Sequence, residues 1–119
     1  VDDPSASAGI EVVYGNDPAT LFRADQQCRI RTLSPLHQEK SVEFYEIRVQ
    51  PGARLASTAH YDGTRELFTV AEGYARISSG ATGCDLANGD TAHYRADVDH
   101  CITNPGDEPL RGYLVVTYK

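Results

Sequence analysis

A carboxylate and an imidazole occupy positions of this sequence where packing alone favours apolar side chains. In two segments rich in β-forming residues, Glu66 has the parity of Phe68, and His100 has the parity of Ile102 and Asn104. Successive side chains of a strand point to opposite faces, so we expect these side chains to face the core together. A buried carboxylate or imidazole is costly unless it meets a partner, a metal or a ligand. The pattern therefore predicts a polar site inside a β-structure.

The elements that must position these residues are short strands. From Ile10 onward, segments rich in Val, Ile, Tyr, Phe and Thr follow one another at the spacing of roughly 8–12 residues that is typical of a sandwich or barrel. Turn sequences separate them, and Asn88-Gly89 predicts a two-residue hairpin because both residues tolerate positive φ. The expected strands are Ala19–Arg23, Arg29–Leu33, Val42–Val49, Glu66–Val70, Tyr74–Ser78, Cys84–Ala87, Thr91–Tyr94, Cys101–Thr103 and Leu110–Tyr118.

Length and pattern predict a single all-β domain. A chain of 119 residues has the size of one ordinary domain. No segment has a convincing helical pattern, so the predicted architecture is a small antiparallel β-barrel or sandwich. The first residues, VDDPSASAG, are small, polar and acidic, which predicts a linker or tail over residues 1–9 and the domain over residues 10–119. The sequence contains no Met, which indicates a processed protein or a piece of a longer one.

Composition and charge exclude several classes of function. Apolar residues make up 40% and charged residues 24% of the chain, which argues against disorder. No apolar run approaches the roughly 18 residues of a membrane span, and the polar, acidic start leads us to expect no secretory signal. The net charge of −6, with scattered basic residues, disfavours contact with nucleic acid by this chain. Three cysteines without CxxC spacing indicate a reducing compartment, and we expect a cytoplasmic protein.

Two segments of the chain resemble the paired signature motifs of the cupin superfamily. The first family motif reads Gly, five residues, His-x-His, three or four residues, Glu, six residues, Gly. This sequence places Gly52, Thr58, His60, Glu66 and Gly73 in that frame. It departs from the motif twice, because Thr58 replaces the first His and the gap before Glu66 is longer by one or two residues.

The second family motif is matched at every spacing. It reads Gly, five residues, Pro-x-Gly, two residues, His, three residues, Asn, and the corresponding residues here are Gly89, Arg95, Asp97, His100 and Asn104. Arg95 and Asp97 replace the Pro and the Gly. Together the motifs span roughly residues 52–104, and the resemblance implies a double-stranded β-helix, the jelly-roll barrel of this superfamily.

The resemblance also implies a set of site residues. The family's metal ligands correspond to His60, Glu66 and His100, with Thr58 at the fourth position. Two imidazoles and a carboxylate are suitable ligands for a divalent transition metal such as Zn, Fe, Mn or Ni. Two alternatives stay open, a metal-free pocket in which these residues hydrogen-bond a ligand or one another, and a purely structural role.

A narrower resemblance concerns the sequence in and around the two motifs. The cupin domain that follows a helix-turn-helix in many bacterial regulators of the XRE type is similar to VEFYEIRVQPGARL, GTRELFTVAEGYARI and LANGDTAHYRADVDHCITNPGDEP. This resemblance implies a domain that senses a small-molecule effector, with Thr58, His60, Glu66 and His100 as ligand-binding residues. It further implies a homodimer, no contact with a membrane, and DNA contact through a helix-turn-helix that this chain lacks.

Two other functions remain as alternatives. The first is a small metal-dependent cupin enzyme of the dioxygenase, isomerase or decarboxylase type, in which a metal with open coordination positions activates the substrate. The second is a structural dimerisation module with an empty barrel, whose interface comes from the strands Val42–Val49 and Leu110–Tyr118.

Overall fold

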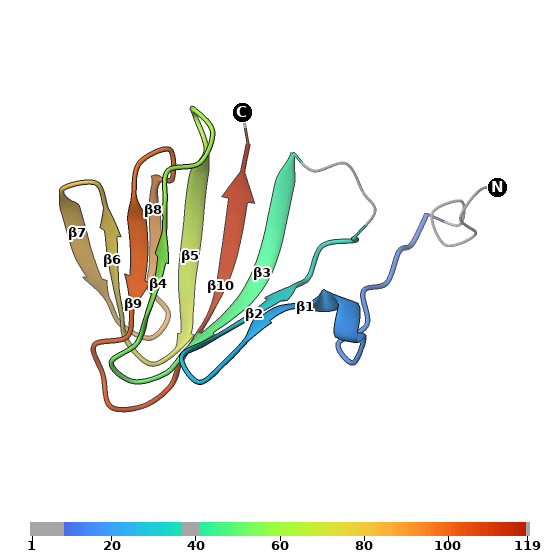
Figure 1. Cartoon of the computed structure of the whole chain (residues 1–119), viewed down its shortest axis with the longest axis horizontal. Helices are drawn as coiled ribbons and strands as arrows, with labels where there is room; N and C mark the ends of the chain where they lie inside the picture. Colours follow the sequence, from blue (N-terminus) through green and yellow to red (C-terminus); the bar gives the residue numbers. More distant parts are fainter. Residues whose placement is uncertain (1–8, 37–40, 119) are drawn as a thin grey trace.

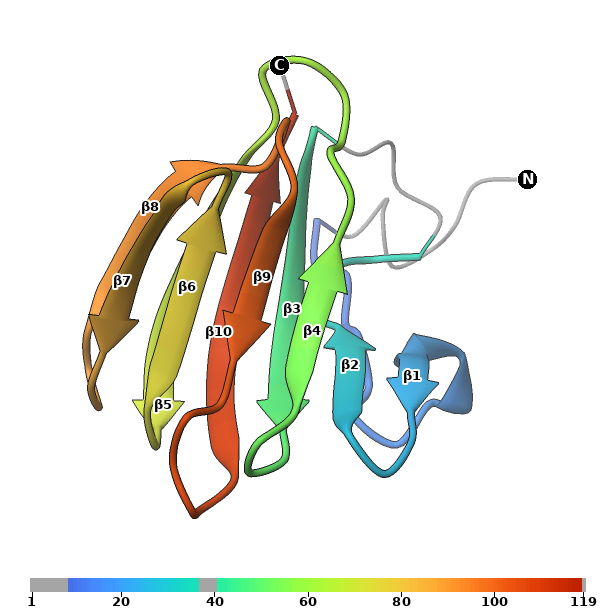
Figure 2. The same ribbon diagram turned by 60° about the vertical axis from the view of Figure 1, so that its left-hand side comes forward.

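Two antiparallel sheets form the fold, seen here in a computed structural model that describes residues 9–36 and 41–118 (Figure 1). In spatial order, the larger sheet contains β1 (Leu21–Ala24), β2 (Cys28–Thr32), β3 (Val42–Val49), β10 (Leu110–Thr117), β5 (Arg65–Glu72) and β8 (Thr91–Arg95). The smaller sheet contains β4 (Arg54–Ser57), β9 (His100–Thr103), β6 (Ala75–Ser79) and β7 (Thr82–Leu86). Figure 2 shows the smaller sheet lying over the larger one. The predicted all-β jelly roll is confirmed.

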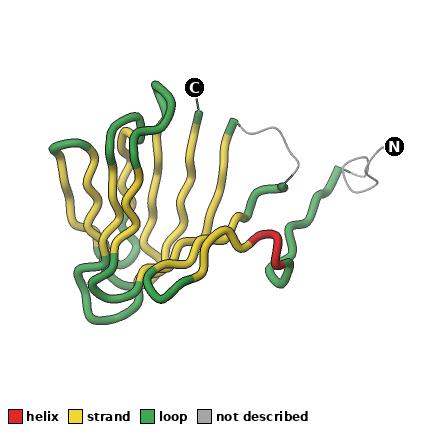
Figure 3. Tube along the Cα trace, in the orientation of Figure 1, coloured by secondary structure: helices red, strands yellow, loops and turns green. Residues whose placement is uncertain are grey.

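Every expected strand has a counterpart in the structure, and one observed strand was not expected. β4 has only four residues, and its Ala and Ser are weak strand formers. It forms because it pairs along its length with β9, from Arg54 opposite Thr103 to Ser57 opposite His100. The expected first strand also begins too early, because Pro18–Thr20 forms a short 3-10 helix (Figure 3). The side chain of Asp17 caps this helix by accepting a hydrogen bond from the Ala19 N–H.

The hairpin predicted at Asn88-Gly89 is wrong. β7 pairs with β6, and β8 pairs with β5, so the turn carries the chain from the smaller sheet to the larger one. Gly89 alone of the two has positive φ, at 89°, and the Asp90 N–H closes the turn on the Ala87 carbonyl at 2.9 Å. The predicted turn is therefore present, but a turn sequence does not specify which strands pair.

The inner faces of the two sheets form the core. Phe68 and Ile47 of the larger sheet and Ile77 and Ile102 of the smaller one are at most 3% exposed. The parity prediction is confirmed, because Glu66, His100 and Asn104 are buried with them at 4%, 5% and 0% exposure. The sheets thus carry two ionisable groups into the interior.

The domain boundaries stay a prediction. All but the last residue of the expected linker, residues 1–9, lie outside the described residues. Within the described ranges, no helix has the length and apolar character needed to cross a bilayer.

Candidate functional site

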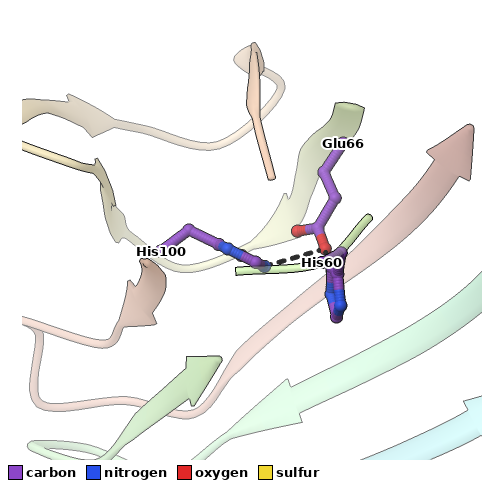
Figure 4. Close-up of side chains that lie close together, drawn as sticks. All are labelled: His60, Glu66 and His100. Carbon is purple, nitrogen blue, oxygen red and sulfur yellow. Dashed lines mark hydrogen bonds and ion pairs between the residues drawn. The ribbon is translucent and has the colours of Figure 1, made fainter. Parts of the chain in front are cut away.

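Three side chains from three elements converge inside the fold (Figure 4). Glu66 begins the inward row of β5, His100 begins β9, and His60 lies in the loop between β4 and β5. His100 Nε2 is 3.1 Å and His60 Nε2 is 3.6 Å from the same oxygen, Oε2 of Glu66. One ligand atom from each residue lies within 4.8 Å of the other two. The structure therefore brings together three of the four residues that the sequence predicted.

The Glu66 carboxylate is held from its other side by Tyr94. The Tyr94 hydroxyl, on the neighbouring strand β8, donates to Glu66 Oε1 at 2.7 Å. Burial, the charge of Glu66 and this hydrogen bond raise the pKa of Tyr94 far above its usual range, so the hydroxyl stays a donor. The side chains of Glu66 and His100 are 5% and 3% exposed, whereas that of His60 is 38% exposed. The cluster is therefore closed on the Glu66 side and open on the His60 side.

The orientation of His100 shows that this cluster needs a proton or a cation. Nδ1 of His100 lies 2.7 Å from the Val98 carbonyl oxygen. A carbonyl only accepts hydrogen bonds, so Nδ1 carries a proton. In a neutral ring, Nε2 then turns its lone pair toward the Glu66 carboxylate, where two electron-rich atoms face each other at 3.1 Å. Either a proton shared by the two groups or a metal ion between them relieves this repulsion.

The three residues fit a divalent transition metal. Imidazole nitrogens and a carboxylate oxygen are its usual ligands, and a backbone carbonyl that fixes the far nitrogen of a ligating His is its usual support. Two atoms that each lie about 2.1 Å from one ion are at most about 4.2 Å apart. The two distances to Glu66 Oε2, 3.1 and 3.6 Å, satisfy this limit, and the two imidazoles each offer a nitrogen within 4.8 Å of the other.

Thr58 is not one of the three converging residues, although it lines a cavity together with one of them, His100. Thr58 is exposed, and this cavity, of about 330 Å³, is also lined by Ala56, Ser78 and Cys101. Ala56, Cys101 and Ser78 are direct cross-strand neighbours on β4, β9 and β6. Thr58, which replaces the first His of the family motif, thus lines this cavity together with small side chains of the smaller sheet.

A larger cavity adjoins the cluster. It has a volume of about 410 Å³, and His60 and Glu66 form part of its wall. Its apolar wall comes from Leu55 of the smaller sheet and, in the larger sheet, from Phe22, Ile30, Ile47, Leu114 and Val116. A cavity of this size, apolar with a few convergent polar groups, is the usual form of a small-molecule site.

The sequence did not reveal a second polar group in the same cavity, the pair of Glu43 and Tyr118. Tyr118 donates from its hydroxyl to Glu43 Oε1 at 2.7 Å, and Tyr45 lies beside them on the cavity wall. The signal was present, because Glu43 and Tyr45 have the parity of the buried Ile47 on β3. Val42 and Phe44, on the opposite parity, are equally apolar in type, so the sequence alone did not show which face of this strand is inside.

Two segments that depart from the family motifs contact each other near His60. They are the lengthened segment before Glu66 and the Arg95-x-Asp97 segment. The loop of residues 58–64, here called the His60 loop, contains the extra length before Glu66. Its Gly63 N–H donates to Asp97 Oδ2 at 2.9 Å, and Asp97 Oδ1 accepts from Arg95 Nε at 2.8 Å. The His60 N–H donates to the Ala96 carbonyl at 2.9 Å. The Arg-x-Asp sequence that replaces Pro-x-Gly therefore fastens the lengthened loop and keeps His60 near Glu66.

We expect Asp97→Asn to lower the melting temperature by a few degrees at pH 7. Arg95 and the Gly63 N–H lower the pKa of Asp97 to about 2, below its unfolded value of about 3.9. The stabilisation is therefore present above about pH 4 and is lost as the pH falls through about 2. Thermal unfolding between pH 2 and pH 7 measures it, and the two proteins should converge at the acid end.

Asp25→Asn is the matched control for this prediction. Arg23 and the backbone of Cys28 and Gln27 hold the pKa of Asp25 at about 2 as well, at a turn between β1 and β2. We expect a similar pH dependence of stability, but only Asp97→Asn should move the NMR resonances of the His60 ring. Unchanged His60 resonances in Asp97→Asn would show that Asp97 does not position this loop.

The chain is similar to known proteins both in sequence and in fold. The family described as "Cupin domain" matches residues 45–116. A solved cupin domain of an XRE-family transcriptional regulator from Enterobacter cloacae has a TM-score of 0.73 and 21% identity, covering 79% of this chain and 99% of that one. An HTH_3-family transcriptional regulator from Vibrio cholerae has a TM-score of 0.72 and 23% identity, covering 80% of this chain and 53% of that one. This chain therefore corresponds to about half of the Vibrio protein.

A protein whose name describes an enzyme also has a fold similar to that of this chain. A predicted oxalate decarboxylase from Thermotoga maritima has a TM-score of 0.68 and 16% identity, covering 84% of this chain and 93% of that one. A search of curated proteins finds no match. At these identities the structural likeness establishes the fold.

Proposed function

This chain belongs to the cupin domain family, and from that premise we propose that it is the small-molecule-sensing domain of a bacterial transcriptional regulator. The observation that carries the proposal is the cavity of about 410 Å³ with His60 and Glu66 in its wall. The effector lies in this cavity and contacts His60 and Glu66 there, directly or through a metal. His100 contributes through the metal or from the neighbouring cavity of about 330 Å³ that it lines with Thr58. Thr58 contributes from that same neighbouring cavity.

The regulator context is supported by the two regulator structures of the same fold. In the Vibrio protein about half of the chain lies outside the matched region, which leaves room for a helix-turn-helix. DNA contact belongs to such a domain, and the net charge of −6 on this chain agrees with that division. We place the protein in the cytoplasm as a homodimer, in which the effector binds two arrangements of the subunits unequally and so shifts DNA affinity.

A divalent transition metal, Zn, Fe, Mn or Ni, fits His60, Glu66 and His100 as its ligands. When bound, it supplies positive charge that holds an oxygen or nitrogen atom of the ligand. The chain's own residues prepare the site. The Val98 carbonyl keeps the Nε2 lone pair of His100 directed at the cluster, and Tyr94 fixes the rotation of the Glu66 carboxylate.

The second candidate function is a metal-dependent cupin enzyme. The exposure of His60, at 38% of its side chain, favours it, because a catalytic metal needs positions open to substrate. The enzyme-named Thermotoga protein of the same fold is consistent with this alternative. Turnover distinguishes the two functions, since a sensor binds its ligand and releases it unchanged.

We expect the wild-type chain to bind one divalent transition metal ion, and we expect His60→Ala and His100→Ala to lose at least 100-fold in metal affinity. Each variant removes one imidazole from the three-residue set, a larger change than loss of a supporting partner, which costs about 10–100-fold. Titration calorimetry with Zn²⁺, Mn²⁺ and Ni²⁺ measures this. His93→Ala is the matched control, because His93 is exposed on β8 and should leave the affinity unchanged. Equal binding by all four proteins would assign the metal to another place.

Sensing itself is tested by thermal shift across amines, amino acids, sugars and small acids. We expect at least one compound to raise the melting temperature and to change the DNA affinity of the full-length regulator. If no compound does either, the sensing proposal is wrong. If a compound is instead chemically converted by the metal-loaded chain, the enzyme alternative replaces it.

A further inference from the structure

Aromatic rings and a carboxylate meet in the wall of the 410 Å³ cavity. Phe22 and Tyr45 pack edge to face with ring centroids 5.9 Å apart and an interplanar angle of 60°. Both rings line the cavity, as does the ring of Tyr118. Tyr118 also donates its hydroxyl to Glu43, so three rings lie on the same cavity wall as one negative charge.

The sheet register places a second carboxylate across from the first. Val116 of β10 is the direct neighbour of Glu43 on β3 and of Glu66 on β5. Adjacent strands lie about 4.8 Å apart, so the Cα atoms of Glu43 and Glu66 are separated by about 10 Å. Both side chains line the cavity, with the apolar surface of Val116 between them. Two acidic side chains thus lie on the cavity wall, one on each side of Val116.

Two other ionisable groups of the wall, Arg23 and His60, each face a carboxylate of their own. Arg23 reaches the cavity, but its Nε is 2.7 Å from Asp25 Oδ2. Burial raises the pKa of Tyr45 and of Tyr118, and hydrogen bonding to Glu43 and the charges of Glu43 and Glu66 raise both further. Glu66 shares its charge with His60 and His100. The repulsion of an anionic ligand therefore comes from Glu43, where a cation would instead meet a carboxylate oxygen and the negative faces of aromatic rings.

We infer that the cavity selects an organic ammonium ion, with its charged nitrogen beside Glu43 and the rings of Phe22, Tyr45 and Tyr118, and its apolar body along Ile47 and Leu114. This inference rests on the proposed function, because it names the class of effector that the cavity takes. The recognition combines a carboxylate with cation–π contacts, the combination by which proteins bind alkylammonium groups.

The test compares three ligands of one shape and three charges. Hexylamine, which is protonated at pH 7, hexan-1-ol and hexanoate are titrated into the metal-free chain and into the chain with Zn²⁺. We expect hexylammonium to bind at least about tenfold more tightly than hexanol, a difference of about 1.4 kcal/mol. Hexanoate should bind most weakly to the metal-free chain.

Two variants locate the ammonium group. Glu43→Gln should reduce hexylammonium affinity about tenfold and leave that of hexanol unchanged. Glu46→Gln is the matched control, because Glu46 lies on the same strand with opposite parity and should have no effect on either ligand. If Glu43→Gln fails to fold, Tyr118→Leu serves instead and should weaken hexylammonium binding selectively, since it removes one ring and one Glu43 contact.

The possible results separate this inference from the proposed function. Equal binding of hexylammonium and hexanol, tightest binding of hexanoate, or equal losses in Glu43→Gln and Glu46→Gln would each overturn the ammonium class while leaving an effector cavity in place. Absence of binding by all three ligands also overturns the ammonium class, and the thermal-shift screen then decides separately whether the domain senses another kind of molecule.

Discussion

Replacing Gly112 with alanine is expected to destabilise the protein by about 3 kcal/mol or more. Gly112 is buried in β10, and an added Cβ would lie 2.3 Å from Cζ of Phe68 and 2.5 Å from the carbonyl oxygen of Thr69. Overpacking of a core costs about 1–3 kcal/mol. The cost lies at the upper end here, because the Thr69 oxygen is backbone and cannot move without disturbing the β10–β5 pairing. Urea unfolding measures the effect, against a total stability of about 5–15 kcal/mol for a domain.

Gly106→Ala is the control for this substitution. An added Cβ at Gly106 meets its nearest atoms at 3.4 Å, Oδ1 of Asn104, and at 3.6 Å, on the Tyr74 ring. We expect a change within about 0.5 kcal/mol. A wild-type unfolding midpoint for Gly112→Ala would show that the Phe68 ring does not pack against β10, and it would contradict the arrangement of the core beneath the cavity.

The second large effect is expected for Asn104→Ala. The side chain of Asn104 is fully buried, and its Nδ2 donates to the carbonyls of Val49 at 2.9 Å and Glu108 at 2.8 Å. Its Oδ1 accepts from the Gly106 N–H at 2.9 Å. Each buried polar group left without a partner costs about 1–3 kcal/mol. The substitution removes the donor of the buried Val49 carbonyl and two part-buried hydrogen bonds, to Glu108 and Gly106. We therefore expect a loss of about 2–3 kcal/mol.

Hydrogen exchange gives this prediction a local measurement. The Gly106 amide should lose its protection in Asn104→Ala, because the structure gives it Asn104 Oδ1 as acceptor. Asn88→Ala, at an exposed turn, is the control and should change the unfolding free energy by less than about 0.5 kcal/mol. Retained protection at Gly106 together with wild-type stability would show that another group closes this turn.

The sequence predicts those features of the fold that depend on the two-residue alternation of strands and on turn-forming residues. Alternation placed Glu66, His100 and Asn104 in the core, because a strand allows only two faces and one of them carried Phe68 and Ile102. It failed for Glu43, because both faces of β3 have apolar side chains. It also failed for β4, whose four residues become a strand only through pairing with β9.

The contacts of the candidate site depend on register, which alternation does not reveal. Tyr94 reaches Glu66 because the two are direct neighbours on β8 and β5. Asp97 reaches Gly63 because two loops far apart in sequence lie against each other. The motif frame identified the three clustered residues. It did not show that the lengthened loop and the Arg-x-Asp substitution compensate for each other, because that relation exists only in space.

The place of β10 in the larger sheet has a consequence for how the protein reaches this structure. β10 lies between β3 and β5, so the β1–β2–β3 half of that sheet joins the β5–β8 half only when the last strand in sequence is inserted between them. The same insertion of β10 places Val116 between Glu43 and Glu66. Loop-closure entropy must be lost before those long-range contacts compensate for it, which puts the folding time in the range of about milliseconds to seconds that is typical of all-β domains. The ligand cavity consequently exists only in molecules whose central strand β10 is in place.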